Sequence, residues 1–369
     1  MSDKPPFRAD QVGSLLRPPE IKQAWADLAA GRLTADALTD VENAAVDRVI
    51  AKQEAAGLKS VTDGEIRRHT WLGDFFFELD GTVAKPVEIK GADGTTVTIT
   101  IPAVTGKIGF SGHPMLEHFK YLAAHTNKTP KVTLPAPAML VSALRDWRQI
   151  VDPDVYPDVR EFYHDLGLAY RGAVSAFYAA GCRYLQLDDV NLAYLCDPSA
   201  RARIEARGDD PDALLSVWVE TVNTAIEGRP DDMVITTHIC RGNFRSTWLA
   251  EGGYEPVADV LFNQYDYDGY FLEYDSDRAG GFEPLRFVPD GNKFVMLGLI
   301  TTKTGALEDK YEIEARIEAA SKFVPIDRLG LSPQCGFAST EEGNIITEDE
   351  QWAKLAHVAK IAADVWPDA

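Results

Sequence analysis

The sequence predicts an α/β fold, and within that class a (β/α)₈ TIM barrel with an inserted β-hairpin. Three observations predict it: short β-rich runs alternate with longer helical segments, eight such runs are present, and 369 residues fit one large barrel. A doubly wound parallel sheet is the main alternative. No Pro-rich or Ser-rich linker divides the chain and it has no evident internal repeat, so we expect residues 1–369 to form a single domain.

The predicted strands are short runs rich in aliphatic and β-branched residues. In chain order they are Val12 to Leu15, Ser60 to Thr62, Lys131 to Leu134, Arg183 to Leu187, Met233 to Thr237, Tyr270 to Tyr274, Phe294 to Leu299 and Leu329 to Leu331.

Helical segments lie between most of these strands. In residues 155–181, 211–228 and 308–324, apolar residues recur at three- and four-residue spacing, which is typical of an amphipathic helix. Acidic residues lie near the start of several of them, and the first ends in Gly181, as helix capping requires.

One segment departs from this alternation of strands and helices. Residues 80–113 alternate polar and apolar residues around "GADG", which is a hairpin signal. We expect an inserted β-hairpin near the mouth of the barrel.

Composition limits the classes of partner. Asp and Glu total 57 against 37 Lys and Arg, which gives a net charge of -20. A field of that sign repels phosphate backbones and anionic lipids, so we expect small-molecule substrates and neither nucleic acid nor membrane as a partner. The chain has no apolar run of the roughly 18 to 20 residues that span a bilayer, and no signal-peptide pattern at the N-terminus. We therefore expect a cytoplasmic protein and leave open whether it forms a homodimer.

The four cysteines are too few for a disulfide framework, so any pair that matters is expected to act as thiolates. Cys182 and Cys196 lie in apolar surroundings and are expected to be small core residues.

The stretch "TTHICRGNFRSTW" is the first candidate for a metal site. His238 and Cys240 lie two apart at the end of a predicted strand, so both side chains point to one side. An ordinary strand end is the alternative, and the metal interpretation depends on further ligands at other strand ends. Glu273 ends the predicted sixth strand and Cys335 follows the eighth. In a barrel these ends meet at one face.

One His, two Cys and one Glu suit Zn²⁺, which accepts nitrogen, sulfur and oxygen donors. Two thiolates and a carboxylate leave such a centre with a charge of about -1, which makes it a poor generator of hydroxide. It is better suited to holding an incoming thiol as a thiolate, with Glu273 loosened or displaced. The pattern therefore indicates alkyl transfer to sulfur.

Acidic residues follow two other predicted strands. Asp188 and Asp189 end "YLQLDD", and Asp63 and Glu65 lie in "TDGE". Carboxylates at a closed site need a partner, which an amino group on a substrate would supply. Helix capping or pairing with neighbouring arginines is the alternative.

Two further groups of residues are candidates for binding anions. Gly13 and Ser14 follow a short predicted strand, where exposed backbone amides can bind a carboxylate, and a simple turn is the alternative. Arg241, Arg245 and Lys303 lie in loops after predicted strands and could clamp an anionic part of a substrate, with solvated loop charges as the alternative.

These residues match a known pattern. From "DQVGSLLRP" to "LSPQCGFAST", the chain resembles the C-terminal catalytic barrel of cobalamin-independent methionine synthase, and in particular its short single-barrel members. The family's His-x-Cys corresponds to "HIC", its strand-end Glu to "LEYDS" and its "DCG" cysteine to "QCG". The resemblance implies a zinc site made by His238, Cys240, Glu273 and Cys335. For homocysteine, it implies a carboxylate site at Gly13 and Ser14 and an ammonium site at Glu65 and Asp188.

The chain departs from the family on the side of the methyl donor. A length of 369 residues leaves no room for the second, N-terminal half that contributes to binding polyglutamylated methylfolate. Where the family has a Trp that stacks on the pterin, "APAMLVS" has Ser142, and where it presents a His after the seventh strand, Lys303 is the closest match. Lys303, or a water held by Asp189, is the candidate source of the proton that a folate donor needs.

The resemblance therefore implies a zinc-dependent methyltransferase that gives methionine from homocysteine and a methylfolate-type donor. The alternatives are transfer to another thiol such as coenzyme M, a non-folate methyl donor, a metal-free barrel like uroporphyrinogen decarboxylase, and a non-enzymatic zinc carrier. The pair of Glu65 and Asp188 favours an amino-acid acceptor over coenzyme M.

Overall fold

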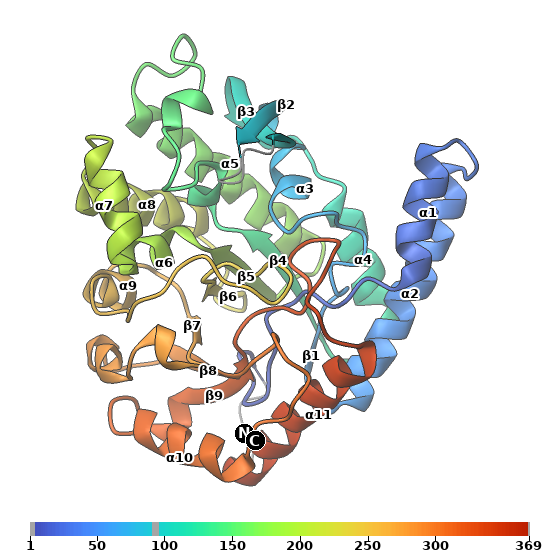
Figure 1. Ribbon diagram of the computed structural model, residues 1–369, viewed down its shortest axis with the longest axis vertical. Coiled ribbons are helices and arrows are strands. Elements are labelled where there is room, and N and C mark those ends of the chain that lie inside the picture. The colour runs from blue at the N-terminus through green and yellow to red at the C-terminus, as the bar shows by residue number, and fades with distance from the viewer. Residues whose placement is uncertain (1–3, 91–95, 368–369) are drawn as a thin grey trace.

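A parallel sheet that curls around a central axis organises the computed structural model, which describes residues 4–90 and 96–367. Within these residues seven strands form the sheet, in the order β1-β4-β5-β6-β7-β8-β9 (Figure 1). The strands are β1 (Ser60–Val61), β4 (Thr129–Pro135), β5 (Tyr184–Asp189), β6 (Val234–Ile239), β7 (Gly269–Glu273), β8 (Phe294–Ile300) and β9 (Leu329–Pro333). The α/β class predicted from the sequence is confirmed.

The first predicted strand, Val12 to Leu15, is wrong. Gly13 has a φ of 148°, and this part of the chain pairs with its neighbours only at isolated points. On one side Ala9 forms a single parallel bridge with Leu331 of β9, and on the other the Leu15 amide donates to Gly64 beyond β1. The segment therefore closes the barrel between β9 and β1 without a regular strand.

Helices cover the outside of the sheet (Figure 1). The predicted helical segments are confirmed as α5, α8 and α10, and α8 starts at Pro211 behind the capping side chain of Asp210. No helix in the described ranges is long and apolar enough to cross a membrane. The helices are α1 (Pro19–Ala29), α2 (Ala35–Ala55), α3 (Gly73–Phe76), α4 (Met115–His125), α5 (Val159–Ala179), α6 (Asn191–Cys196), α7 (Pro198–Ala206), α8 (Pro211–Ile226), α9 (Ala258–Asn263), α10 (Lys310–Ala320) and α11 (Glu348–Val365).

The predicted hairpin is confirmed as β2 (Asp80–Lys90) and β3 (Thr96–Gly109), which pair antiparallel. Its expected turn, "GADG", lies outside the described residues. The base of the hairpin is attached to the loop after β4, because the Val104 amide donates to Ile150 O (2.7 Å) and the Asp152 amide to Val104 O (2.9 Å). The hairpin and this loop thus form one wall.

The interior of the barrel below its mouth holds a buried ion pair. Lys131 Nζ of β4 lies 3.4 Å from Asp10 Oδ1, and neither side chain is exposed. The Asp10 carboxylate also accepts hydrogen bonds from the Tyr184 hydroxyl (2.8 Å) and the Ser60 hydroxyl (2.6 Å). Burial lowers the pKa of Lys131, and the charge of Asp10 opposes that effect. This network links the N-terminal segment to β1, β4 and β5 under the site.

Replacing Asp10 by Asn is expected to lower the free energy of unfolding by about 3–5 kcal/mol, because it leaves the Lys131 charge buried without a countercharge. Urea denaturation followed by circular dichroism measures this. Glu20→Gln, which removes an exposed pair with Arg48, is the control and is expected to cost at most about 1 kcal/mol. A loss that small for Asp10→Asn would contradict the assignment.

Candidate metal centre and substrate cavities

Four side chains from the carboxyl ends of three strands converge at the mouth of the barrel. His238 lies in β6 and Cys240 directly after it, Glu273 ends β7, and Cys335 follows β9. Their candidate ligand atoms all lie within 4.8 Å of one another, and all four residues are buried. The structure thus brings together the complete set predicted from the sequence, in a donor combination that suits tetrahedral Zn²⁺.

His238 has one ring nitrogen engaged and one free. Its Nδ1 lies 3.3 Å from Phe271 O, whereas Nε2 is buried without a hydrogen-bond partner. A proton on Nδ1 donated to that carbonyl leaves the Nε2 lone pair available, which is the usual arrangement of a metal-binding imidazole. Burial lowers the pKa of His238, but the neighbouring Cys335 sulfur and nearby carboxylates outweigh it and raise the pKa to about 9. The surroundings of the ring therefore favour a positive charge.

The two thiols form a close pair. Cys240 Sγ and Cys335 Sγ lie 3.4 Å apart. A hydrogen bond from Cys240 lowers the pKa of Cys335 well below that of an ordinary thiol, and His238 acts in the same direction. One sulfur of the pair thus loses its proton readily. A thiolate is the form in which sulfur binds a metal.

Glu273 is held from both sides. Its Oε1 accepts a hydrogen bond from the Arg241 backbone amide (2.7 Å), and its Oε2 accepts one from Arg278 (2.8 Å). Burial raises the pKa of Glu273, while these two donors hold the carboxylate in place. Both carboxylate oxygens of Glu273 therefore have hydrogen-bond partners within the fold.

A small cavity of about 20 Å³ adjoins three of the four residues, His238, Cys240 and Cys335. Its walls combine the two thiols and His238 with the predicted residues Ser14, Glu65 and Asp188. The remaining lining residues are Val12, Trp71, Gly336 and Ser339. The structure therefore places the predicted acceptor-binding residues around the candidate metal centre.

The two carboxylates of this cavity are buried, and each lies near a cation of the protein. Arg68 Nη1 lies 3.5 Å from Glu65 Oε1, and the charge of His238 opposes the rise in the pKa of Asp188. Glu65 Oε1 accepts a hydrogen bond from the Thr133 hydroxyl (2.7 Å), but Oε2 is buried without a partner. Asp188 Oδ1 accepts one from Gln186 (2.7 Å). Burial raises the pKa of Asp188 to about 7, and Glu65 adds to the effect. A substrate ammonium group would supply a partner for Glu65 Oε2, which has none within the fold.

The Gly13 and Ser14 segment offers an amide on the other side of the cavity. The Ser14 amide has no acceptor among the residues that the structure describes. Gly13 lies so close to β4 that a Cβ atom there would be 2.5 Å from Thr133 Cγ2. Only glycine therefore lets this segment approach Thr133 and Glu65.

Gly336 makes a second close approach, because a Cβ atom there would lie 2.0 Å from Ser14 Oγ. We expect Gly336→Ala to displace Ser14 and to cost about 1–3 kcal/mol of stability, as overpacking does. The cost is expected to fall in the double variant Gly336→Ala with Ser14→Ala, which removes the clashing hydroxyl. Thermal unfolding of these two variants and of Ser14→Ala alone measures it, and an unchanged cost of Gly336→Ala in the Ser14→Ala background would refute the explanation.

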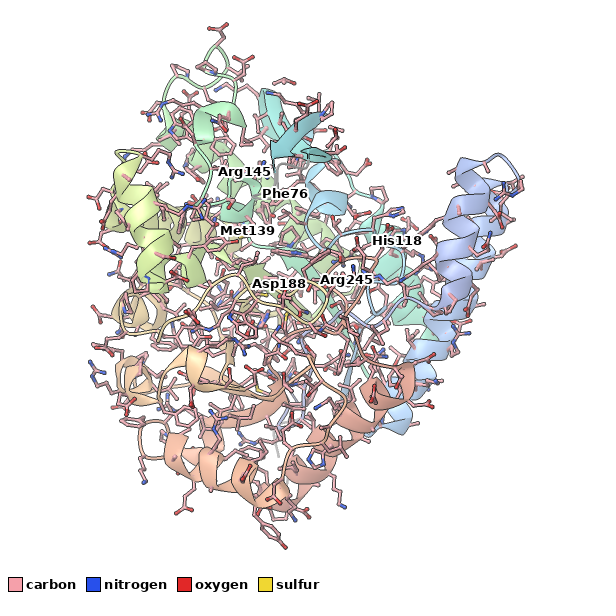
Figure 2. The ribbon with its side chains drawn as sticks, in the orientation of Figure 1. Phe76, His118, Met139, Arg145, Asp188 and Arg245 are labelled. Carbon is pink, nitrogen blue, oxygen red and sulfur yellow. The ribbon has the colours of Figure 1, made fainter. Side chains whose placement is uncertain are left out.

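A larger cavity of about 800 Å³ opens beside the small one. The two share Trp71, Cys240 and Ser339, so they meet at a candidate metal ligand. Apolar residues dominate the larger cavity, among them Leu72, Phe77, Ile101, Met139, Leu140, Ile150, Phe244 and Leu249. Ile101 belongs to the hairpin, so the predicted insertion does border the mouth. Figure 2 marks Met139 and Arg145 of this cavity and Asp188 of the small one.

With this geometry established, we compared the chain with known proteins. Residues 7–362 match the family model described as the cobalamin-independent synthase catalytic domain. The chain belongs to this family. The family resemblance inferred from the sequence is confirmed.

Three relatives indicate where the chain lies within the cobalamin-independent synthase family. The uncharacterized protein YxjH of Bacillus subtilis is 48% identical over 365 residues, which cover 98% of this chain and 96% of YxjH. A Listeria monocytogenes protein, provisionally named a vitamin-B12 independent methionine synthase, has a crystal structure that matches with a TM-score of 0.79 and 42% identity, covering 98% of this chain and 99% of that one. The 5-methyltetrahydropteroyltriglutamate–homocysteine methyltransferase of Corynebacterium glutamicum is 25% identical over 90% of this chain, which spans only 41% of that enzyme.

Four residues that the sequence suggested for catalysis or anion binding lie in neither cavity. Asp189 is buried and accepts a hydrogen bond from the Leu192 amide (2.9 Å) at the start of α6. Lys303 Nζ donates to Asn243 Oδ1 (3.1 Å) and Thr247 O (3.0 Å), which joins the loops after β8 and β6. These two side chains are occupied with holding the loops of the barrel in place.

The predicted anion clamp of Arg241 and Arg245 is not formed either. The Arg241 guanidinium is fully buried and packs over Tyr254, with its carbon 4.6 Å from the ring centroid. Arg245 is exposed, on a left-handed backbone with a φ of 47°. The basic side chain that does line the larger cavity is Arg145, in the loop after β4.

Sequence reasoning missed Trp71, Arg145 and Arg278. Trp71 borders both cavities, and Arg278 holds Glu273. Arg145 and Arg278 follow predicted strands in the same way as the residues that were found. Their position was a usable signal, although the sequence does not show which loop side chains turn inward.

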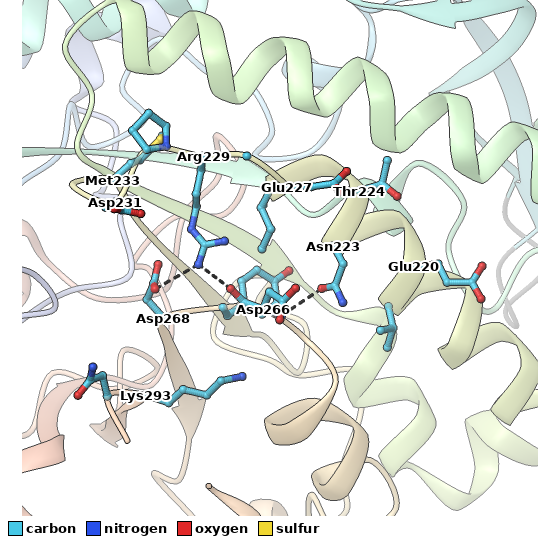
Figure 3. Close-up of a pocket in the computed structure, with 16 residues that line it drawn as sticks. Glu220, Asn223, Thr224, Glu227, Arg229, Asp231, Met233, Asp266, Asp268 and Lys293 are labelled. Atoms are coloured by element: carbon cyan, nitrogen blue, oxygen red, sulfur yellow. Dashed lines mark hydrogen bonds and ion pairs between the residues drawn. The ribbon is translucent and has the colours of Figure 1, made fainter. Parts of the chain in front are cut away.

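A third cavity, of about 900 Å³, lies at the opposite end of the barrel (Figure 3). Met233, Asp268 and Lys293 precede β6, β7 and β8, which places it at the amino ends of these strands. Its Arg229 is engaged within the fold, with Asp266 O (2.8 Å) and Asp268 Oδ1 (3.2 Å). At this end of a barrel, such contacts serve stability.

Proposed function

We propose that the chain is a zinc-dependent S-methyltransferase that moves a methyl group from a methylfolate-type donor to the thiol of homocysteine, giving methionine. We further propose that residues 1–369 act as one catalytic barrel. Membership of the cobalamin-independent synthase family supports the reaction type, and the Corynebacterium glutamicum relative is named for this reaction. The observation that carries the proposal is the meeting of the two cavities at Cys240.

The residues around the small cavity match the charged groups at the amino-acid end of the acceptor. Glu65 and Asp188 receive the ammonium group, whose positive charge offsets two buried carboxylates. The unpaired amide of Ser14 receives the carboxylate. These contacts fix both charged groups of homocysteine and direct its thiol towards the two cysteines, which lowers the entropy cost of reaching the reactive geometry.

His238, Cys240, Glu273 and Cys335 would hold the zinc ion, and the free Nε2 of His238 and the close thiol pair fit that role. When bound, Zn²⁺ would supply a Lewis acid that keeps the acceptor sulfur in its thiolate form at neutral pH. The Arg241 amide and Arg278 stabilise Glu273 as a carboxylate while the acceptor occupies the site.

The larger cavity suits the donor. Its apolar walls exclude water from the methyl carbon while a sulfur–carbon bond forms and the donor's nitrogen–carbon bond breaks. The amine leaves readily only when protonated, and the imidazole of His69 lines this cavity.

Coenzyme M, or a donor other than folate, is the alternative. A sulfonate acceptor needs cationic partners, but the small cavity presents two carboxylates to whatever binds there. This observation favours an amino acid. Ser142 lies on the wall of the larger cavity, at the position where the resemblance expects a Trp that stacks on the pterin. The donor is therefore tested separately from the acceptor.

The test is product formation by zinc-loaded protein. The protein is given L-homocysteine or coenzyme M together with 5-methyltetrahydrofolate bearing one or three glutamates, and products are quantified by mass spectrometry. We expect methionine from homocysteine and no methylation of coenzyme M. Methylation of coenzyme M at a similar rate would contradict the acceptor, and failure of both folates where another methyl donor succeeds would contradict the donor.

A further inference from the structure

Arg145 is the one basic side chain of the larger cavity that lacks a partner within the described residues. The other, His69, lies 2.7 Å from Glu341 Oε2. For Arg145 only the backbone amide is engaged, with Ser142 O (2.8 Å), and its half-buried side chain has no hydrogen bond or ion pair. Unpaired guanidinium groups inside a cavity are suited to binding carboxylates or phosphates.

Arg145 lies on a wall that two cavities share, and this position points to a binding role more clearly than its charge does. A further cavity of about 320 Å³ lies on its outer side, and this cavity shares Ser142 and Arg145 with the larger one. The two cavities therefore adjoin at these two residues. Cys240 lies on the wall of the larger one, and the other, the outer chamber, is lined by Trp147, Arg148, Arg207 and Trp218. In the view of Figure 2, Arg145 lies beyond Met139 from Asp188.

The other charged side chains of the outer chamber have partners within the fold. Arg148 pairs with Asp146 (3.1 Å), Arg207 pairs with Asp209, and Asp158 caps α5 by accepting from the Arg160 amide. Among the arginines of the outer chamber, Arg145 is thus the one without a carboxylate partner in the described residues. Arg145 therefore differs from an ordinary solvated surface arginine, because it lines two adjoining cavities and its charged neighbours are engaged with other residues.

The loop that carries Arg145 is fixed before any ligand binds. Asn191, which is fully buried in α6, accepts from the Ala143 amide (2.8 Å) and donates to Ala138 O (2.9 Å) and Val141 O (3.1 Å). Three contacts from one side chain hold the loop on both sides of Ser142. A guanidinium on a fixed loop loses less entropy on binding.

We infer that Arg145 binds an anionic end group of the methyl donor, whose apolar body fills the larger cavity and whose methyl-bearing end lies next to Cys240. This inference rests on the proposed function only for the identity of the transferred group, a methyl group. The donor class is therefore an elongated molecule with an apolar or aromatic body and a terminal carboxylate. Compact, uncharged or cationic methyl donors lack the group that Arg145 binds.

The test is a binding experiment that needs neither zinc nor an acceptor. The probes are N-(4-aminobenzoyl)-L-glutamate, its uncharged diamide and 4-nitrophenyl phosphate, each titrated by calorimetry into the full chain. We expect the wild type to bind the dicarboxylate about tenfold more tightly than the diamide, the equivalent of about 1.4 kcal/mol. Tighter binding of the phosphate than of the dicarboxylate would overturn the carboxylate assignment.

The variants separate a binding role from a structural one. Arg145→Gln is expected to abolish the preference for the dicarboxylate while leaving affinity for the diamide unchanged, and Arg145→Lys should retain part of it. Arg160→Gln, which removes an exposed guanidinium at the start of α5, should behave as wild type. A preference that survives in Arg145→Gln, or an equal loss for dicarboxylate and diamide, would overturn the inference. Because no turnover is measured, absence of methionine formation with this preference intact would count against the proposed function only.

Discussion

Replacing Cys335 by serine is expected to abolish stoichiometric zinc binding at micromolar metal and to lower kcat by more than about a hundredfold. Loss of a residue that only orients a metal ligand already lowers metal affinity or activity by about 10–100-fold, so loss of a ligand itself should cost more. The reason lies in the thiol pair, because Cys335 is the sulfur whose pKa the neighbouring Cys240 thiol lowers. Zinc content after dialysis and methionine formation measure the two effects.

Cys182→Ser is the matched control for Cys335→Ser. Cys182 is equally buried, but its sulfur contacts only Tyr184 O (3.4 Å), a contact that a serine hydroxyl can reproduce. We expect this variant to retain zinc and activity. If both variants lost zinc alike, or if Cys335→Ser kept it, the four-residue centre would be refuted.

Asp188→Asn is expected to raise KM for L-homocysteine about a hundredfold, since removing one partner of a buried charged pair costs about 2–5 kcal/mol. The effect should depend on the substrate's ammonium group. With 4-mercaptobutyrate, which keeps the thiol and carboxylate but lacks the amine, wild type and variant should differ by less than about threefold in kcat/KM. Equal losses for the two thiols would show that Asp188 does not bind the amine.

Stability of the metal-free protein gives an independent measure of Asp188. Burial raises its pKa from 3.8 to about 7, so the folded state holds the proton more tightly than the unfolded chain does. The wild type therefore loses stability as the pH rises between these values, whereas the Asn variant does not. We expect the stability of Asp188→Asn relative to wild type to increase across this pH range and to level off above it. Asp189→Asn, at the neighbouring position in β5, should show no effect on KM.

The sequence predicted the mouth of the barrel well because strand order alone fixes it. Once "HIC", "LEYDS" and "QCG" are assigned to the ends of parallel strands, the topology brings His238, Glu273 and Cys335 together without knowledge of any side-chain contact. Strand limits were less accurate. β6 extends to Ile239, past the predicted end at Thr237, so His238 is part of the strand.

What the sequence could not predict depends on contacts between distant segments. The run from Val12 to Leu15 has strand-like residues, but Gly13 has a φ of 148° and lies so close to Thr133 that a Cβ atom would clash with it. The prediction that Arg241 lines a substrate cavity was inaccurate for a similar reason. Arg241 turns inward onto Tyr254, and Arg145, in a comparable loop, turns into the cavity. Loop position is readable from sequence, whereas side-chain direction is set by neighbours such as Asn191 and Tyr254.

The central claim is that His238, Cys240, Glu273 and Cys335 hold a zinc ion that receives the acceptor thiol. Zinc content combined with zinc-edge X-ray absorption, recorded with and without L-homocysteine, tests it most directly. The account predicts one zinc per chain bound through two sulfurs, and a third sulfur when homocysteine is added. A sulfur count that stays at two would contradict homocysteine as the acceptor, and a protein that cannot be loaded with zinc would contradict the metal centre itself.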